Sequence, residues 1–321
     1  MSNEEIEEIK SLQKKRVFFN ALKYVPSFQF FRDRCDKKKQ VLINSILDEV
    51  VYSSDLMRKY SAVDLTQIPP IGNRIWMFWY TGFDTAPDLV KKCTELAKSL
   101  DDADVVLIDK SNLEEYFSFE GNIKELFENG KITIQTFSDI LRTQLLSRRG
   151  GFWFDATLMP LRKDFITVHS RQNYFSIKHA RNDMLLKKKW NEFFTEGRWS
   201  TYCNGAGIGN PVFSFIYDVF LSYFREYDAA FDYWQTDYIW LYCYEHFDWA
   251  KAIIDSIQPS VNCSYNFHSK LLKEYDPSDW NKTIRENEFQ KLGWRVIAKQ
   301  GRAHTDNQKE TYYDHFLSFS L

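Results

Sequence analysis

The chain has 321 residues, of which 44% are hydrophobic and 17% aromatic, and a formal net charge of −2. This balance excludes a globally basic protein that binds nucleic acid, so no nucleic-acid partner is expected. The five cysteines are an odd number without a Cys-x-x-Cys pair, which argues against a disulfide framework or a zinc site and favours a reducing, cytoplasmic compartment.

Residues 1–70 are expected to form an N-terminal helical extension. Apolar residues recur there at helical spacing, as in Ile43, Ile46, Leu47 and Val50. The first residues are acidic where a secretory signal would be basic, and no apolar run reaches the roughly 18 residues of a spanning helix. Neither a secretory signal nor a transmembrane helix is therefore predicted.

Residues 10–40 combine basic and aromatic side chains. The segment holds ten Lys or Arg against two acids, with five phenylalanines interleaved. This mixture favours contact with an anionic membrane surface, which would make the protein peripheral at the inner face of the cell membrane. The alternative is an extension that packs its rings on the main domain and leaves its lysines in solvent.

Pro69–Gly72 marks the break between the extension and the main domain, residues 71–321. A strand is predicted at 73–80, a helix at 86–100 and a second strand at 104–108. This alternation of strand and helix predicts an α/β domain with a mostly parallel central sheet.

The rest of the domain continues this alternation. Its predicted elements are helices at 112–116, 122–128 and 134–149, strands at 152–154 and 174–177, and helices at 212–225, 237–247 and 249–257. Residues 204–209 are rich in glycine but lack the full dinucleotide-binding pattern. They are interpreted as a close-packed strand and turn that line a pocket, with a phosphate-binding loop as the alternative.

The most informative stretch runs from Ser138 to Thr157. Asp139 and Arg142 are three residues apart, so a helix places them on one face. Two glycines then supply a left-handed helix end, and three aromatic residues favour a short buried strand. Asp155 follows at a carboxyl end of the sheet, where open α/β sheets bind ligands.

This arrangement resembles the donor-binding core of nucleotide-sugar glycosyltransferases of the GT-A type. More narrowly, it is similar to the capsular polysaccharide synthesis group within the DXD-motif-containing glycosyltransferases (glycosyltransferase family 32-like). The resemblance extends to Ile75–Trp79, Ala86–Val90, Tyr233–Tyr238 and Lys291–Arg295, and covers roughly residues 70–315. It implies a Rossmann-like single domain of the GT-A type.

The resemblance also implies that the chain binds a nucleotide-sugar donor, namely a UDP-hexose such as UDP-galactose or UDP-glucose. Asp139 and Arg142 would contact the hydroxyl groups of the sugar, and Arg142 would also reach the phosphate. Asp155 corresponds to the first acid of the D-x-D turn, near the ribose and the metal. Asp237 would face the reaction centre and orient the acceptor hydroxyl, although an acid in a first helical turn also serves as a cap.

Aromatic and basic residues outside the central motif complete the implied donor site. One ring of Phe78, Trp79 and Tyr80 would stack on the base. The residues that would fold over the diphosphate as a lid are Lys291, Trp294 and Arg295, with His304 as a further candidate nearby. Arg295 replaces the more usual lysine, and its planar fork suits phosphate.

Metal dependence is left open by the sequence. Thr157 stands where many members of the family carry the second acid, which is usually the closer metal ligand. A hydroxyl is a weaker ligand for a hard cation than a carboxylate. Manganese or magnesium would bind through Asp155, Thr157, the diphosphate and water, with Asp237 as another acid that could contribute.

The implied function is a retaining transfer of a hexose to a lipid-linked (undecaprenyl-linked) or oligosaccharide acceptor in capsule or exopolysaccharide synthesis. The favoured mechanism is same-face attack assisted by the leaving phosphate. One alternative is a glycoside hydrolase that uses Asp139 and Asp155 as its acid pair. Another is a non-catalytic protein that binds sugar or membrane on a degenerate transferase scaffold, an idea motivated by Thr157.

Overall fold

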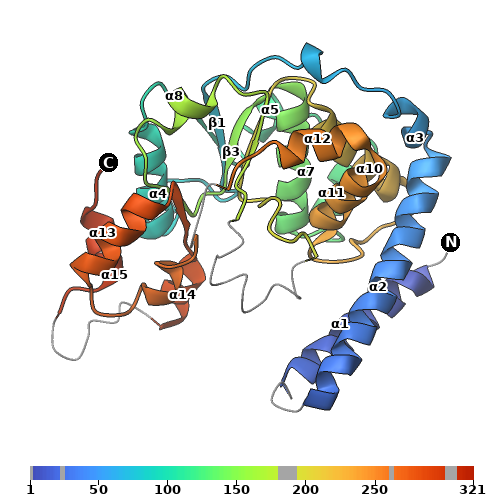
Figure 1. Ribbon diagram of the computed structural model, residues 1–321, viewed down its shortest axis with the longest axis horizontal. Helices are drawn as coiled ribbons and strands as arrows, with labels where there is room; N and C mark the ends of the chain where they lie inside the picture. Colours follow the sequence, from blue (N-terminus) through green and yellow to red (C-terminus); the bar gives the residue numbers. More distant parts are fainter. Residues whose placement is uncertain (1–2, 22–25, 180–193, 260–263, 301–308) are drawn as a thin grey trace. The chain divides into compact units, whose positions relative to one another are not determined.

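Figure 1 shows the chain as a computed structural model, which describes residues 3–21, 26–179, 194–259, 264–300 and 309–321, with the side chains of 3, 16–21, 26–33 and 299–300 excepted. The chain forms two compact units. Unit 1 comprises Met1–Val63, Phe119–Thr143 and Ser214–Ala250, and unit 2 comprises Asp64–Ser118, Gln144–Phe213 and Lys251–Leu321. The boundary expected at residue 70, between the N-terminal extension and the main domain, stays a prediction.

Unit 2 is built on a five-stranded sheet in the order β2-β1-β3-β6-β5. Its strands are β1 (Arg74–Phe78), β2 (Asp104–Ile108), β3 (Gly151–Phe154), β5 (Tyr174–Ser176) and β6 (Cys203–Ala206). β1 pairs in parallel with β2 and β3, whereas β6 is antiparallel to both β3 and β5. Four of the five strands therefore share one direction, which confirms the predicted α/β class and the mostly parallel sheet.

Aromatic side chains dominate the core around this sheet. Phe152 and Phe154 on β3 are fully buried, and Phe165 and Phe289 contact them at ring-centroid distances of 5.3 Å and 5.6 Å. Both contacts are edge-to-face, a geometry that adds about 0.5–1.5 kcal/mol to the effect of burial. Many of the rings counted in the sequence thus serve the core of unit 2.

Two glycines allow close approaches that a side chain would block. Gly150 lies just after α7 (Ile134–Arg148) with a φ of +63°, and a Cβ there would lie 2.9 Å from the carbonyl oxygen of Ala206. Its own carbonyl oxygen accepts a 2.7 Å hydrogen bond from Nε1 of the buried Trp76. A Cβ at Gly207 would lie 1.8 Å from the carbonyl oxygen of Pro69. The glycine-rich segment at 204–209 is therefore a close-packed strand and turn, as predicted, while its pocket-lining role stays a prediction.

A second, two-stranded sheet pairs β4 (Leu158–Pro160) with β7 (Phe289–Lys291). The strands are antiparallel, and Leu158 lies opposite Lys291. The sequence did not predict this pairing, because each strand has only three residues and a long stretch of chain separates them. It brings the C-terminal motif next to the turn that follows β3.

Helix α4 (Asp88–Lys98) buries one face against the C-terminal part of unit 2. Its side chains Leu89, Cys93 and Leu96 share a buried cluster with aromatic residues of α13 and α15. The helix was predicted from residue 86, but it begins at Asp88 because Pro87 adopts an extended ψ of 148° at the cap. The other helices and helical turns of unit 2 are η1 (Leu65–Gln67), α5 (Leu113–Tyr116), α8 (Phe165–His169), η3 (His268–Lys270), α13 (Pro277–Glu286), α14 (Trp294–Gln300) and α15 (Tyr312–Ser318).

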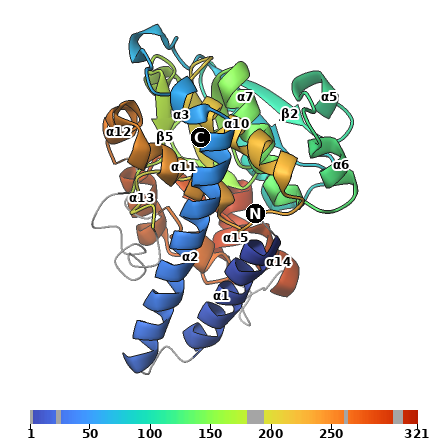
Figure 2. The ribbon, with the colours of Figure 1, turned by 90° about the vertical axis from the view of Figure 1, so that its right-hand side faces the viewer.

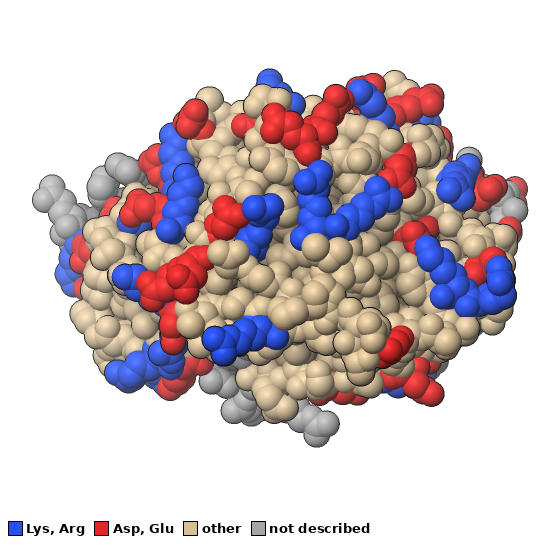
Figure 3. Space-filling view, turned by 90° about the horizontal axis from the view of Figure 1, so that it is seen from above, with Lys and Arg blue, Asp and Glu red and all other residues tan. Residues whose placement is uncertain are grey.

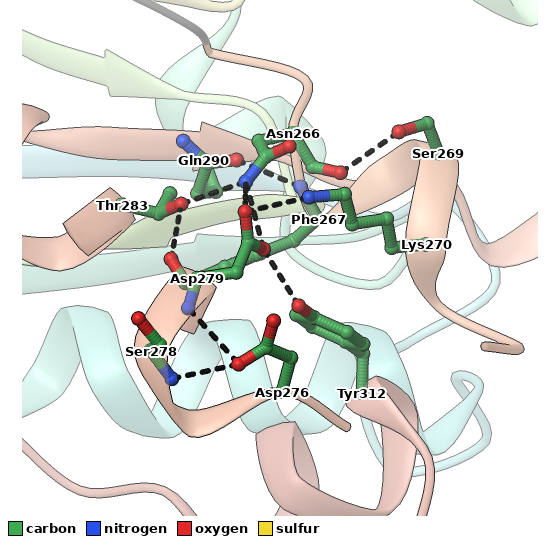
Figure 4. A network of polar contacts seen from close by, with 10 residues as sticks. All are labelled: Asn266, Phe267, Ser269, Lys270, Asp276, Ser278, Asp279, Thr283, Gln290 and Tyr312. Atoms are coloured by element: carbon green, nitrogen blue, oxygen red, sulfur yellow. Dashed lines mark hydrogen bonds and ion pairs between the residues drawn. The ribbon is translucent and has the colours of Figure 1, made fainter. Parts of the chain in front are cut away.

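A polar network fixes the segment that contains Asn266 and Lys270 to α13 and α15 (Figure 4). The carboxylate of Asp279 accepts hydrogen bonds from Lys270 Nζ at 2.7 Å, from Tyr312 Oη at 2.6 Å and from Asn266 Nδ2 at 3.2 Å. Asn266 Nδ2 also lies 2.7 Å from Thr283 Oγ1. Burial acts to raise the pKa of Asp279, but the hydrogen bonds that it accepts outweigh burial and hold the pKa below its usual value.

Unit 1 is helical, as predicted for its N-terminal part, while the extent of the N-terminal extension stays a prediction. Its helices are α1 (Asn3–Ala21), α2 (Pro26–Ser53), α3 (Leu56–Lys59), α6 (Ile123–Glu128) and α11 (Gln235–His246), and three further helices have residues in both units, namely α7, α10 (Pro211–Glu226) and α12 (Asp248–Asp255). α1 and α2 run antiparallel and side by side (Figure 2). None of the helices in the described part of the chain combines the length and the apolar character that crossing a bilayer requires.

Lys39 on α2 ties this helix to the rest of unit 1. Its ammonium lies 3.1 Å from Asp232 Oδ2 and 2.9 Å from Gln13 Oε1, and the residue is only 5% exposed. A buried ion pair of this kind leaves an uncompensated charge if one partner is removed. Lys39 is therefore not part of the basic surface that the sequence predicted for residues 10–40.

Surface charges of both signs are interspersed on the face shown in Figure 3. Among the exposed charged residues of the chain, Lys38 pairs with Glu8 in unit 1 and Arg74 pairs with Asp104 in unit 2. Exposed pairs of this type contribute at most about 1 kcal/mol each.

Candidate functional site

The turn Asp155–Ala156–Thr157 follows β3 directly, as the sequence predicts. The N–H of Asp155 donates to the carbonyl oxygen of Tyr202 at 2.9 Å, and the N–H of Leu158 donates to the carbonyl oxygen of Asp155 at 2.8 Å. Ala156 is buried against the start of α4. The backbone of the turn is thus held at both ends and packed in the middle.

Lys291 joins the two polar side chains of this turn. Its Nζ donates to Asp155 Oδ2 at 2.6 Å and to Thr157 Oγ1 at 2.7 Å. The lysine side chain is 16% exposed and the Asp155 side chain 31% exposed. The structure therefore brings together three residues that the sequence assigned to the donor site.

The backbone around Lys291 explains why its side chain reaches the turn. Its N–H donates to the carbonyl oxygen of Ser264 at 2.7 Å, and the next N–H, of Leu292, donates to the carbonyl oxygen of Thr157 at 3.0 Å. Together with the β4–β7 ladder, these bonds fix the strand on both sides. The ammonium is placed by the fold and not by a mobile loop.

Three further side chains complete the surroundings of this cluster, namely Trp153, Tyr202 and His268. Trp153 Nε1 donates to Asp155 Oδ1 at 2.9 Å, so both carboxylate oxygens of Asp155 have a partner. The Lys291 ammonium lies 5.6 Å from the ring centroid of Tyr202. Burial and, to a smaller extent, the charge of Lys291 lower the pKa of His268, which favours a neutral imidazole there.

The oxygen atoms of this turn do not fit a divalent cation. Both oxygens expected to coordinate it, on Asp155 and Thr157, already accept from the Lys291 ammonium. Two unit charges 4 Å apart near a protein surface repel each other by about 4 kcal/mol, and a divalent ion beside an ammonium doubles that figure. Magnesium and manganese also favour carboxylate oxygens over a lone hydroxyl.

Trp79, Trp294 and Arg295 form a second group within unit 2. The rings of Trp79 and Trp294 meet edge to face with their centroids 5.8 Å apart. The guanidinium of Arg295 lies 5.2 Å from the ring centroid of Trp294, a cation–π geometry. The end of β1 and the start of α14 therefore meet through these rings, as expected if both contribute to one donor site.

The three aromatic residues that end β1 differ in exposure. Phe78 is buried, whereas Trp79 and Tyr80 are partly exposed. The rings of Phe78 and Tyr80 lie edge to face at 6.3 Å. Base stacking by one of the three stays a prediction, and the exposure favours Trp79 and Tyr80 for that role.

The other predicted site residues that the structure describes, Asp139, Arg142 and Asp237, lie in unit 1. Arg142 pairs with Oδ1 of Asp139 on α7, and Oδ2 of the same carboxylate accepts a hydrogen bond from Thr236 Oγ1 at 2.7 Å. Arg142 is 3% exposed and the Asp139 side chain is 25% exposed, so this is a partly buried ion pair and not a solvated surface pair. Asp237, the residue after Thr236, is 7% exposed in the first turn of α11.

Comparison with protein families decides what kind of protein this is. The family model described as capsular polysaccharide synthesis protein matches residues 24–316. The chain belongs to this family. The resemblance found in the sequence is thereby confirmed for the capsular polysaccharide synthesis group, and the wider D-x-D grouping stays a prediction.

Two other comparisons add little to the family assignment. A search of curated proteins finds no match. A solved structure described as the PaToxG glycosyltransferase is similar with a TM-score of 0.38 and 14% sequence identity, over 70% of this chain and 84% of that chain.

Two contacts of the predicted site residues go beyond what the sequence predicts. Thr236, which binds Asp139, carried no signal beyond its place in a motif that resembles the family's. Trp153 was read only as a core residue, and its bond to Asp155 depends on the turn. His304 lies outside the described residues.

Proposed function

We propose that this protein of the capsular polysaccharide synthesis family is a retaining glycosyltransferase that uses a UDP-hexose donor. The observation that carries the proposal is the pair formed by Asp155 and Lys291 at the carboxyl end of β3. A carboxylate and an ammonium fixed at this edge of an α/β sheet suit a ligand with a diphosphate and a ribose.

The chemistry of transfer sets the demands on these residues. The bond between the anomeric carbon and the β-phosphate oxygen breaks, and its electron pair stays on that oxygen. The acceptor hydroxyl forms the new bond to the anomeric carbon on the same face, and its proton passes to the leaving phosphate. Negative charge therefore grows on the diphosphate, where a positioned cation stabilises the transition state.

Each residue of the unit 2 cluster has a role in this proposal. Lys291 binds the diphosphate as a point charge, and Asp155 holds the lysine and approaches the ribose. Arg295 offers a second cation, since it is exposed at the start of α14. Trp79 and Trp294 supply apolar ring faces for the base.

The roles of the unit 1 residues follow from the family resemblance. Asp139 and Arg142 bind the hydroxyl groups of the sugar, and Asp237 orients the acceptor hydroxyl. The burial of Arg142 beside Asp139 supports a fixed guanidinium over a solvated one. The acceptor in this proposal is a lipid-linked or oligosaccharide intermediate of capsule or exopolysaccharide synthesis.

A melting assay with a panel of nucleotide sugars tests the donor assignment. Saturable stabilisation is expected from UDP-galactose or UDP-glucose, and hundredfold excess of ligand over Kd raises the unfolding free energy by about 2.7 kcal/mol. Stabilisation by free oligosaccharides and not by any nucleotide sugar would instead favour the hydrolase.

Transfer assays on variants test the residue roles. Asp155→Asn and Arg142→Ala should each lower transfer about a hundredfold or more, the range found when one transition-state contact is removed. Arg148→Ala is the matched control, because Arg148 is an exposed arginine on the same helix. Full activity in both folded variants would refute the assignment.

A further inference from the structure

We propose that the ammonium of Lys291 takes the place of the divalent cation at the donor diphosphate, so that donor binding needs no metal. This inference rests on the proposed function and concerns the same site. Its starting point is geometric, since the Nζ atom sits between Asp155 Oδ2 and Thr157 Oγ1 at 2.6 Å and 2.7 Å. These are the two side chains from which the D-x-D pattern would coordinate a metal.

The charges of the cluster explain why position 157 carries a threonine and not a second acid. In a D-x-D turn two carboxylates face a divalent ion, so the site is close to neutral before the diphosphate arrives. Here one carboxylate, on Asp155, faces one ammonium, on Lys291, and the second position carries the neutral hydroxyl of Thr157. A second acid at that position would leave the turn with an excess negative charge where the diphosphate must bind.

The ammonium also has the capacity to bind a ligand. A lysine has three N–H donors, and within the described part of the chain two of them have acceptors on Asp155 and Thr157. The third is available for a phosphate oxygen. Charge-assisted hydrogen bonds to phosphate are about twice as strong as neutral ones.

The fold holds this cation where a metal would otherwise be recruited from solution. Lys291 is the last residue of β7, opposite Leu158 of β4, and the next N–H donates to the carbonyl oxygen of Thr157. The lysine backbone and the turn are therefore parts of one hydrogen-bonded structure. Little ordering is required when the donor binds, which favours affinity.

Donor binding to the unmodified protein gives the decisive measurement. UDP-hexose affinity, measured by titration calorimetry, should be the same within twofold in EDTA and in manganese. Manganese titrations followed by electron paramagnetic resonance should show no stoichiometric binding to the protein without donor. Donor binding that disappears in EDTA and returns with manganese overturns the inference, as does one tightly bound manganese per chain.

Variants of Lys291 and Thr157 test the same inference by changing the charges of the cluster. Lys291→Ala should weaken donor binding about tenfold to a hundredfold, the range for a hydrogen bond to a charged group. The double variant Lys291→Ala/Thr157→Asp recreates a D-x-D turn and should bind one manganese ion with or without donor. Lys282→Ala is the matched control, because Lys282 is an exposed lysine on α13.

The outcomes separate this inference from the proposed function. If no nucleotide sugar binds with or without manganese, the proposed function fails and this inference fails with it. If donor binds only with manganese, the proposed function stands and only the inference fails. Should Lys291→Ala fail to fold, the measurements on the unmodified protein still decide.

Discussion

The Nζ of Lys291 lies 2.6 Å from Oδ2 of Asp155, although 136 positions separate the two residues in the sequence. The same ammonium reaches Thr157 Oγ1, two residues further along the turn. A basic residue of the C-terminal motif and the acid of the central motif therefore form one charged group in the native state. This contact gives Thr157 a role, as an acceptor for lysine, that does not depend on a metal.

Replacing Thr157 by valine tests that role. Thr157→Val keeps the shape of the side chain but removes one of the two acceptors of the Lys291 ammonium. We expect a loss of about 1 kcal/mol in unfolding free energy, typical of one hydrogen bond, and donor binding weaker by about fivefold. Thr157→Ser, which keeps the hydroxyl, should bind donor more tightly than the valine variant in the same titration. Equal affinities would contradict the role given to the hydroxyl.

Removing the hydroxyl of Thr236 tests the corresponding contact in unit 1. Thr236→Val leaves the partly buried Asp139 carboxylate without the bond to Oδ2, so the position of Arg142 is less fixed. We expect a stability loss of about 1–2 kcal/mol by urea unfolding and a fall in kcat/KM of about tenfold. Thr143→Val is the control, because Thr143 is also buried on α7 but donates to a backbone carbonyl oxygen. If both variants reduce kcat/KM alike, Thr236 has only a structural role.

Local sequence patterns are enough to predict several of the helices and strands that carry the site residues. The strand at 104–108 was predicted with the bounds it has in the structure, and the motif helix was predicted within one residue of α7. Continuous apolar runs and helical periodicity are strong signals, because burial dictates them along the chain. The order of β3 and the Asp155 turn followed from the same reasoning.

Local sequence patterns do not predict the contacts that define the site. β4 and β7 are too short to carry a periodic signal, and their pairing is set by the tertiary fold. The bonds of Lys291 to the turn depend on that register, and the bond of Thr236 to Asp139 depends on how α11 lies against α7. The resemblance to the family predicts many of these residues, but only the structure shows which of them are in contact.

Acid should reveal the contribution of Asp279 to stability. Its pKa in the folded protein lies below the unfolded value of about 3.9, because its hydrogen bonds outweigh burial. A depressed carboxyl pKa stabilises the fold fully above about pH 4, and this stabilisation disappears as the pH falls through the folded pKa. Asp279→Asn should therefore be less stable than the unmodified protein at pH 7, and the difference should shrink towards pH 3.

Urea unfolding at several pH values measures this difference directly. Asp84→Asn serves as the control, since Asp84 is an exposed acid of unit 2. A gap between the Asp279→Asn and unmodified proteins that stays constant from pH 7 to pH 3 would show that ionisation of Asp279 has no part in the network of Figure 4.

Two exposed rings before α11 are candidates for contact with the acceptor glycan. Tyr233 and Trp234 are 70% and 43% exposed, and their rings meet edge to face at 5.0 Å. An aromatic face that stays in water suits a sugar ring, so Trp234→Ala should raise the KM for acceptor about fivefold and leave donor stabilisation unchanged. Tyr52→Ala, at an exposed aromatic residue of α2, is the control. An unchanged acceptor KM would assign Trp234 to another role.

Vesicle binding tests the basic segment of residues 10–40. Lys14 and Lys15 are exposed on α1, whereas Lys39 is buried against Asp232 and cannot reach a membrane surface without breaking that pair. Each lysine near an anionic surface contributes about 1 kcal/mol, so replacing Lys14 and Lys15 together by alanine should weaken sedimentation with phosphatidylglycerol vesicles by about tenfold or more. Binding of the unmodified protein should also fall with added salt, because the interaction is screened.

The control for vesicle binding replaces two exposed lysines of α4, Lys91 and Lys98, which keeps the change in net charge equal. If the control weakens binding as much as the α1 variant, net charge and not this segment directs the protein to the membrane.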